Sequence, residues 1–233
     1  MPDPDGPPRQ LALDLPFETR LDAEDFLVSP ANEEAYGVVE AWPDWPDPVL
    51  LMVGPEGAGK SHLAAIWAAR SHAWTVARAA LRDADVPRLA STGALVLEDC
   101  DQAHGHEDAL FHLLNLVRER RTFLLMTARH APEAWGLATA DILSRLRLAP
   151  RVQLGAPDDG LLKAVLVKLF LDRQLVIDTT VVDYIAQRIE RSIPAARAVV
   201  DGLDRLALER GRRITRALAG EILRGAEDDG EDT

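Results

Sequence analysis

A chain of 233 residues, 47% of them hydrophobic, is long enough to bury one large core, or one core and a small second domain. Its formal net charge of -12 argues against DNA binding through a broad basic face. No apolar run approaches the ~20 residues of a membrane-spanning helix, and the beginning lacks the pattern of a signal peptide. The one cysteine, Cys100, cannot form a disulfide within the chain. We therefore expect a cytoplasmic location and no membrane partner.

The first predicted unit is a flexible segment over residues 1–22, which begins with Pro, Asp and Gly and offers little to a core. In its later part, leucines occupy alternate positions, which is typical of an extended segment. A proline after them prevents a helix from continuing through this part of the chain. The side chains of interest are Gln10, Leu11, Leu13 and Leu15. An exposed apolar segment of this kind is typical of a short peptide ligand. A strand that folds back on the domain fits its chemistry equally well.

A glycine-rich loop follows the buried strand that is expected over residues 49–53, and a helix follows the loop. The loop has the pattern G-x-x-x-x-G-K-S and consists of Gly54, Pro55, Glu56, Gly57, Ala58, Gly59, Lys60 and Ser61. In this strand–loop–helix context, backbone N–H groups and the helix N-terminus bind phosphate oxygens. We expect Lys60 to reach the β- and γ-phosphates of a nucleotide and the Ser61 hydroxyl to bind Mg²⁺.

A second apolar strand, expected over residues 94–99, ends in Glu98 and Asp99. Downstream of a P-loop, this is the Walker B arrangement, in which Glu98 binds Mg²⁺ directly or through water and Asp99 orients or deprotonates the attacking water. An aspartate in the second position reaches less far than a glutamate, so we expect slow hydrolysis at most. Thr127 ends the strand expected over residues 122–127. Either its hydroxyl contacts the γ-phosphate or the attacking water, or the residue is an ordinary threonine at a strand end.

Two further short strands complete a parallel sheet, and from residue 156 onward the pattern indicates helices only. The added strands are expected over residues 74–77 and 151–154. The late helices are expected over residues 161–173, 181–191, 194–210 and 214–224, with Asp178 or Thr179 as the N-cap of the second. We expect an α/β nucleotide-binding subdomain over residues 23–155, a four-helix lid over residues 156–226 and a disordered acidic tail over residues 227–233.

Three stretches resemble DnaA, the AAA+ replication initiator family, and the resemblance covers roughly residues 20 to 225. Gly-Lys-Ser-His-Leu at 59–63 resembles its P-loop exit, and Phe26-Leu27-Val28 with Asn32 and Ala35 resembles its adenine-side segment. Leu143-Ser144-Arg145-Leu146 resembles its box VII. The resemblance implies an AAA+ P-loop NTPase fold that binds ADP or ATP with Mg²⁺, with Asn32 and His62 among the nucleotide-binding residues. It also implies that Arg145 is an arginine finger, whereas spacing alone favours a salt bridge within its own subunit.

Two positions depart from the DnaA pattern. The family usually has an acid after the sensor 1 strand, where this chain has Ala128 after Thr127. The expected sensor 2 arginine falls on Pro194, which leaves Arg197, one turn further on, and Arg191 as candidates for that role. Both departures bear on sensing of the γ-phosphate rather than on nucleotide binding itself.

The N-terminal pattern narrows the resemblance, because Gln10-Leu11-Ala12-Leu13-Asp14-Leu15 fits the motif that docks in the DNA polymerase sliding clamp. Gln10 would lie at the rim of the clamp pocket, with Leu13 and Leu15 as buried anchors. A clamp motif on a DnaA-like module that stops at the lid resembles the Hda family, the regulatory inactivators of DnaA. The resemblance implies two partners, the clamp and DnaA, and a nucleoid- or replisome-associated regulator without sequence-specific DNA binding. Self-association is compatible with an arginine finger used in trans.

Two other functions remain open at this point. One is an autonomous AAA+ ATPase of the helicase-loader or clamp-loader type, which remodels a partner through its own hydrolysis cycle. The other is a DnaA-like adaptor in which the nucleotide only stabilises the fold. The sequence does not decide whether ADP or ATP is the working ligand, nor the oligomeric state.

Overall fold

The computed structural model of the chain describes residues 23–102 and 106–228, except for the side chains of residues 225–228. The proposed clamp motif, with Gln10, Leu11, Leu13 and Leu15, lies outside the described residues, as does most of the acidic tail expected over residues 227–233. The last helix extends to Asp228 and so includes the first two residues of that predicted tail. None of the helices in the described part of the chain combines the length and the apolar character that a membrane crossing requires.

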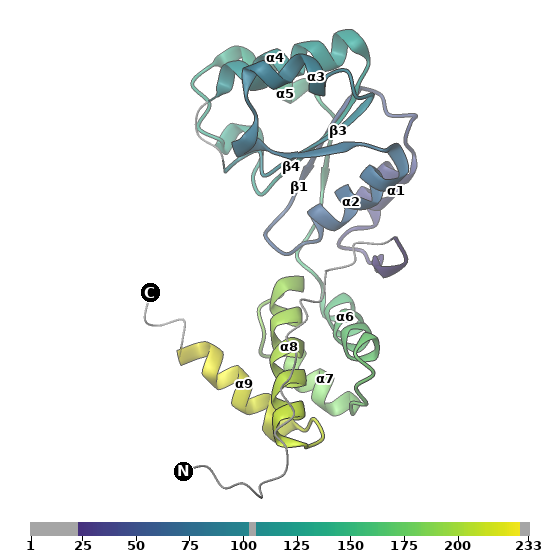
Figure 1. Cartoon of the computed structure of the whole chain (residues 1–233), viewed down its shortest axis with the longest axis vertical. Coiled ribbons are helices and arrows are strands. Elements are labelled where there is room, and N and C mark those ends of the chain that lie inside the picture. Colours follow the sequence, from purple (N-terminus) through teal and green to yellow (C-terminus); the bar gives the residue numbers. More distant parts are fainter. Residues whose placement is uncertain (1–22, 103–105, 229–233) are drawn as a thin grey trace, which may run out of the picture.

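The five predicted strands form one parallel sheet in the order β2-β3-β4-β1-β5 (Figure 1). The strands are β1 (Val49–Val53), β2 (Trp74–Ala77), β3 (Ala94–Glu98), β4 (Phe123–Ala128) and β5 (Arg151–Gln153). All residues of β1, which lies between β4 and β5, are buried, because helices cover both faces of the sheet. The prediction of a five-stranded parallel sheet flanked by helices is therefore confirmed.

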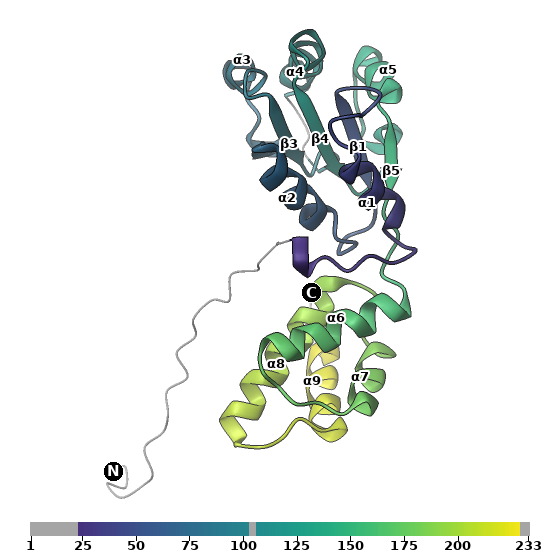
Figure 2. The ribbon, with the colours of Figure 1, turned by 90° about the vertical axis from the view of Figure 1, so that its right-hand side faces the viewer.

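The alternation of side chains along the strands divides the sheet between two apolar clusters. Val49, Leu51 and Val53 pack on one face, whereas Leu50 and Met52 pack on the other. Figure 2 shows the helices that cover the two faces. The first face is covered by α3 (Val86–Leu89), α4 (Glu107–Arg120) and α5 (Ala140–Leu148), and the second by α1 (Glu33–Glu40) and α2 (Lys60–Ser71).

Four helices after β5 form the lid, which builds its own apolar cluster apart from the sheet (Figure 1). They are α6 (Asp159–Asp172), α7 (Thr179–Ala186), α8 (Ile193–Arg210) and α9 (Arg216–Asp228). Three of them begin at a side chain that accepts a backbone N–H bond from the first turn, namely Asp158, Asp178 and Ser192. Asp178 is thus the cap of α7, one of the two residues expected there.

Helix α7 ends at Ala186, although the periodicity predicts a helix as far as residue 191. The chain leaves the helix because Ser192 must cap α8, where its Oγ accepts the Ala195 N–H at 3.2 Å. The next residue, Ile193, donates its N–H to the carbonyl oxygen of Gly57 at 3.2 Å. The early end of α7 therefore allows the start of α8 to contact the P-loop.

The packing of the lid core predicts that alanine substitutions at two neighbouring residues of α6 differ in their effect on stability. Phe170 is fully buried in the lid cluster, so Phe170→Ala should lower the free energy of unfolding by about 3–5 kcal/mol. Leu171 is 67% exposed, and Leu171→Ala should change it by no more than about 0.5 kcal/mol. Urea denaturation followed by circular dichroism measures both values. Equal losses in the two variants would contradict the packing of α6.

Candidate nucleotide site

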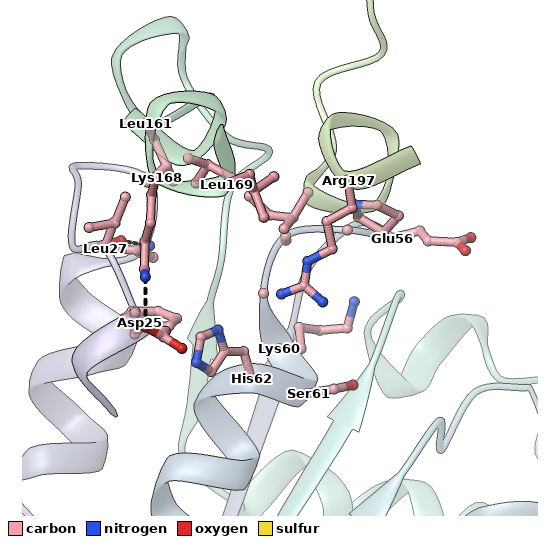
Figure 3. Close-up of a pocket in the computed structure, with 18 of the residues that line it drawn as sticks. Asp25, Leu27, Glu56, Lys60, Ser61, His62, Leu161, Lys168, Leu169 and Arg197 are labelled. Carbon is pink, nitrogen blue, oxygen red and sulfur yellow. Dashed lines mark hydrogen bonds and ion pairs between the residues drawn. The ribbon is translucent and has the colours of Figure 1, made fainter. Parts of the chain in front are cut away.

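A cleft of about 1260 Å³ lies where the P-loop side of the sheet faces the lid (Figure 3). The sheet side contributes the P-loop residues from Glu56 to Ser61 and the segments that follow β3 and β4. The lid side contributes residues of α6 and the start of α8. Ionisable side chains line both sides, so the cleft is suited to a charged ligand rather than an apolar one.

The P-loop has a backbone conformation that depends on glycine. Gly57 and Gly59 have φ angles of +71° and +97°, in the left-handed region that residues with a Cβ rarely adopt. A Cβ on Gly57 would also lie 2.5 Å from the Cβ of Ser192 at the beginning of α8. The loop is therefore both curled for phosphate binding and in close contact with the lid.

Lys60 is the first residue of α2, and its ammonium group is turned back toward the loop. Its Nζ donates to the carbonyl oxygens of Gly54 and Pro55, each at 2.7 Å. Burial lowers the pKa of Lys60 from its usual value, while the negative charge of Asp101 opposes this shift. The lysine thus lies in the cleft with donors that a phosphate group can take over from the two carbonyl groups.

Glu98, Ser61 and Thr127 form a hydroxyl–carboxylate cluster beside the P-loop. The Ser61 Oγ donates to Glu98 Oε2 at 3.3 Å, and the Thr127 hydroxyl also donates to the Glu98 carboxylate. Burial raises the pKa of Glu98, whereas the hydrogen bond from Thr127 lowers it. A hydroxyl and a carboxylate are the oxygen ligands that Mg²⁺ prefers, so these residues fit the ion that the sequence predicts.

Asp99 differs from its predicted position at the end of a strand. Strand β3 ends at Glu98, and Asp99 has a φ of +57°, which is uncommon for a residue with a side chain. Its N–H donates to Thr127 Oγ1 at 3.1 Å, and its carboxylate accepts from Gln102 Nε2 at 3.1 Å. Asp99 lines the cleft, but part of its hydrogen-bonding capacity is used within the loop.

The structure separates the two candidate sensor 2 arginines. Arg197, on α8, lines the cleft, and Figure 3 shows its guanidinium pointing toward Lys60. Its Nε is buried and has no hydrogen-bond partner among the described residues. Arg191 instead pairs with Asp159 at 2.8 Å and does not line the cleft. Arg197 is therefore the candidate that a phosphate in the cleft can satisfy.

The predicted adenine-side residues build an aromatic wall of the cleft. The ring of Phe26 stacks on Tyr36 and meets His62 edge-on, with centroids 5.7 and 5.3 Å apart. Asn32 is buried, accepts the Ser29 N–H at 2.8 Å and donates to the Leu27 carbonyl at 3.0 Å. Its amide therefore shapes the backbone of this segment.

Two ion pairs in the cleft were not predicted from the sequence. Lys168 of α6 reaches Asp25 across the cleft at 2.7 Å, as Figure 3 shows. Arg129, which follows β4, pairs with Glu56 of the P-loop at 2.7 Å. A charged residue directly after a parallel strand is a signal for Arg129, since carboxyl ends of such strands face ligands. The Lys168 pair depends on how the lid sits and has no local signal.

Arg145 lies on α5 and does not line the cleft of its own chain. Its guanidinium lies over the ring of Phe111 on α4, 4.8 Å from the centroid. Within the described residues it forms no ion pair of the kind that the sequence left open as an alternative. The contact with the Phe111 ring holds the Arg145 side chain in place without using its hydrogen-bond donors.

Comparison with known proteins places the fold among AAA+ proteins. No protein-family model matches the chain, and no curated protein matches its sequence. Domain III of DnaA from Thermotoga maritima has a TM-score of 0.76 at 16% identity, over 91% of this chain and 98% of that one. AMPPCP-bound DnaA from Aquifex aeolicus has a TM-score of 0.69 at 18% identity, over 88% and 69%. The T. maritima Holliday junction motor RuvB has a TM-score of 0.70 at 14% identity, over 87% and 71%. The chain has a DnaA-like AAA+ fold.

The raised pKa of Glu98 predicts a pH-dependent stability difference. A carboxyl group whose pKa is raised in the folded state stabilises the fold at low pH, and this contribution is lost as the pH rises through the folded pKa. Without nucleotide and Mg²⁺, Glu98→Gln should therefore melt at a higher temperature than wild type at pH 7. The difference should disappear as the pH falls below the usual glutamate pKa of 4.5.

Melting curves from pH 4 to pH 8 measure this difference, and the exposed Glu34→Gln serves as a control for the loss of one charge. A stability gain in Glu98→Gln that is independent of pH would contradict the assignment of a desolvated carboxylate at this position.

Proposed function

We propose that this chain is a nucleotide-binding AAA+ regulator of the Hda type. Docked on the DNA-loaded sliding clamp, it stimulates hydrolysis of the ATP bound to DnaA and so prevents re-initiation of replication. The observation that carries the proposal is that the P-loop cleft and Arg145 lie at separate places in one chain. The P-loop cleft faces the lid, whereas Arg145 lies on α5 outside that cleft, where it is free to serve the nucleotide site of another molecule.

The ligand of the cleft is ADP or ATP with Mg²⁺. Lys60, Arg197 and the P-loop N–H groups bind the phosphates, and Ser61 with Glu98 binds the metal ion. When bound, Mg²⁺ neutralises phosphate charge. The wall of Phe26, with His62 beside it, borders the base. The AMPPCP bound to A. aeolicus DnaA supports an adenine nucleotide in a cleft of this fold.

Intrinsic hydrolysis by this chain is slow at most. Asp99 has a short side chain and already accepts a hydrogen bond from Gln102, so it is a poor base for an attacking water. The Thr127 hydroxyl donates to Glu98 and orients that carboxylate. The nucleotide then acts as an assembly switch, since the P-loop contacts the lid where Ile193 meets Gly57.

Hydrolysis takes place in the partner. A chain that matches DnaA domain III over nearly its whole length can take the place of a neighbouring AAA+ subunit beside DnaA. Arg145 then enters the DnaA site and stabilises the charge on the transferring phosphoryl group, an effect of roughly 10³–10⁵ in rate in related systems. The same surface allows self-association into a homo-oligomer.

Docking on the clamp depends on Gln10, Leu11, Leu13 and Leu15, and this part of the proposal rests on the sequence motif alone. The described residues begin with the short helix η1 (Ala23–Asp25), and its last residue pairs with Lys168 at the cleft. Residues 1–22 thus serve as the clamp tether, 23–155 as the nucleotide-binding subdomain, 156–226 as the lid and 227–233 as an acidic tail. The net charge of -12 disfavours tight, sequence-independent DNA binding through a broad basic face, so the clamp brings the chain to the nucleoid.

A second candidate function is an autonomous ATPase of the helicase-loader or clamp-loader type. The likeness to RuvB, described as a branch migration motor, favours it at the level of the fold. Rapid hydrolysis by the chain alone would support this alternative. An adaptor with a purely structural nucleotide would show neither hydrolysis nor stimulation of DnaA.

The role of Arg145 is tested by Arg145→Ala in a reaction that contains DnaA-ATP and clamp loaded on DNA. The variant should leave hydrolysis at the rate of DnaA alone, because the developing phosphoryl charge loses its cation. It should still fold and bind the clamp, since a cation–π contact at such a site contributes only about 0.5–1 kcal/mol.

The matched control is Arg147→Ala on the same helix, which removes an exposed arginine paired with Glu133 at 3.1 Å. This control should stimulate DnaA as the wild type does. Full stimulation by a clamp-bound Arg145→Ala variant would show that Arg145 is not the finger.

A further inference from the structure

The segment after β4 is fixed in place by a buried carboxylate. The side chain of Asp101 is only 5% exposed, and its Oδ2 accepts the N–H groups of Arg129 and His130, each at 3.0 Å. Asp101 comes from the loop after β3, so two neighbouring strand ends are joined at this point. The backbone of Arg129 is therefore anchored, and only its side chain is left to move.

The guanidinium of Arg129 lies at the cleft and pairs with the P-loop. Arg129 Nη1 lies 2.7 Å from Glu56 Oε2, with 39% of the arginine side chain and 66% of the glutamate side chain exposed. Both residues line the cleft, together with Lys60. The positive charge of Arg129 also lowers the pKa of Lys60, which means that the two cations lie close together.

The charges around the loop change when an anion binds there. Phosphate groups that are bound by the P-loop N–H groups bring negative charge next to the carboxylate of Glu56, which is repelled, and near Arg129, which is attracted. An exposed ion pair such as Arg129–Glu56 is worth little and is easily exchanged. A guanidinium–phosphate contact is stronger, since Arg presents two parallel donors to a phosphate.

We infer that Arg129 is a further phosphate-binding residue, which exchanges Glu56 for the γ-phosphate and makes the site bind ATP more tightly than ADP. We assign Arg129 to the γ-phosphate because it lies two residues after Thr127. The hydroxyl of Thr127 donates to the carboxylate of Glu98, which is the proposed ligand of Mg²⁺. Glu56 competes with the γ-phosphate, because its carboxylate pairs with Arg129 when no triphosphate is bound. This inference rests on the proposed nucleotide site.

The test measures equilibrium dissociation constants for AMPPCP and for ADP, both with Mg²⁺, by isothermal titration calorimetry of the full chain. Arg129→Ala should weaken AMPPCP binding about tenfold, which is the loss of one charge-assisted contact, while ADP binding changes less than about threefold. Arg129→Lys should retain part of the preference for AMPPCP. Glu56→Gln should act in the opposite direction and tighten AMPPCP binding selectively, because the competitor loses its charge.

The control variant is Arg88→Ala, which removes a surface arginine that pairs with Asp85 at 3.6 Å and does not line the cleft. It should leave both affinities unchanged. If Arg129→Ala changes the two affinities by the same factor, the pair only stabilises the loop and the inference is overturned. If Arg129→Ala does not fold, Glu56→Gln decides, and the absence of a selective gain overturns the inference. A wild-type chain that binds neither nucleotide would instead overturn the proposed nucleotide site as well.

Discussion

The parallel pairing of β4 with both β1 and β3 is the constraint on which the site depends. Met126 of β4 lies between Leu51 of β1 and Leu97 of β3, so the three strands end side by side. At or just beyond these ends lie the P-loop, the Glu98–Asp99 pair and the segment with Thr127 and Arg129. Because helices bury both faces of these strands, a shift of one residue would turn apolar side chains to the wrong face. The core thereby fixes the distances among the groups in the cleft.

The lid adds a second set of constraints at the rim of the cleft. On α8, the N–H of Ile193 contacts Gly57 and the guanidinium of Arg197 points toward Lys60, while Lys168 of α6 reaches Asp25. Each contact joins the lid to a segment that lines the cleft. A ligand that displaces Lys60 or Arg197 therefore acts on both parts of the chain at once. This coupling is the physical basis of the nucleotide-controlled presentation of Arg145 that we propose.

Local patterns in the sequence were sufficient to predict the sheet and the P-loop, because both depend on neighbouring residues. The apolar run before Gly54 and the two acids at the end of the strand expected over residues 94–99 indicated which strand ends face the cleft. Local signals also narrowed the cap of α7 to Asp178 or Thr179, and the structure shows that it is Asp178. The end of α7 at Ala186 was not, since it depends on the contact between Ile193 and a distant loop.

Long-range geometry decided the remaining features of the site. Spacing left Arg191 and Arg197 as alternatives, which the structure distinguishes because Arg197 lines the cleft whereas Arg191 pairs with Asp159. The pair of Arg129 with Glu56 joins residues that the sequence separates widely. Asp99 has a positive φ, and its N–H donates to Thr127 on the neighbouring strand, a long-range contact that the local sequence does not reveal.

The central claim is that this chain acts on nucleotide bound to a partner rather than on its own. It is tested most directly by following ATP pre-bound to DnaA, with and without this chain and with and without clamp loaded on DNA. The account predicts conversion to ADP only when both the chain and the loaded clamp are present. Persistence of DnaA-bound ATP in the complete reaction, while the chain alone hydrolyses free ATP, would contradict it.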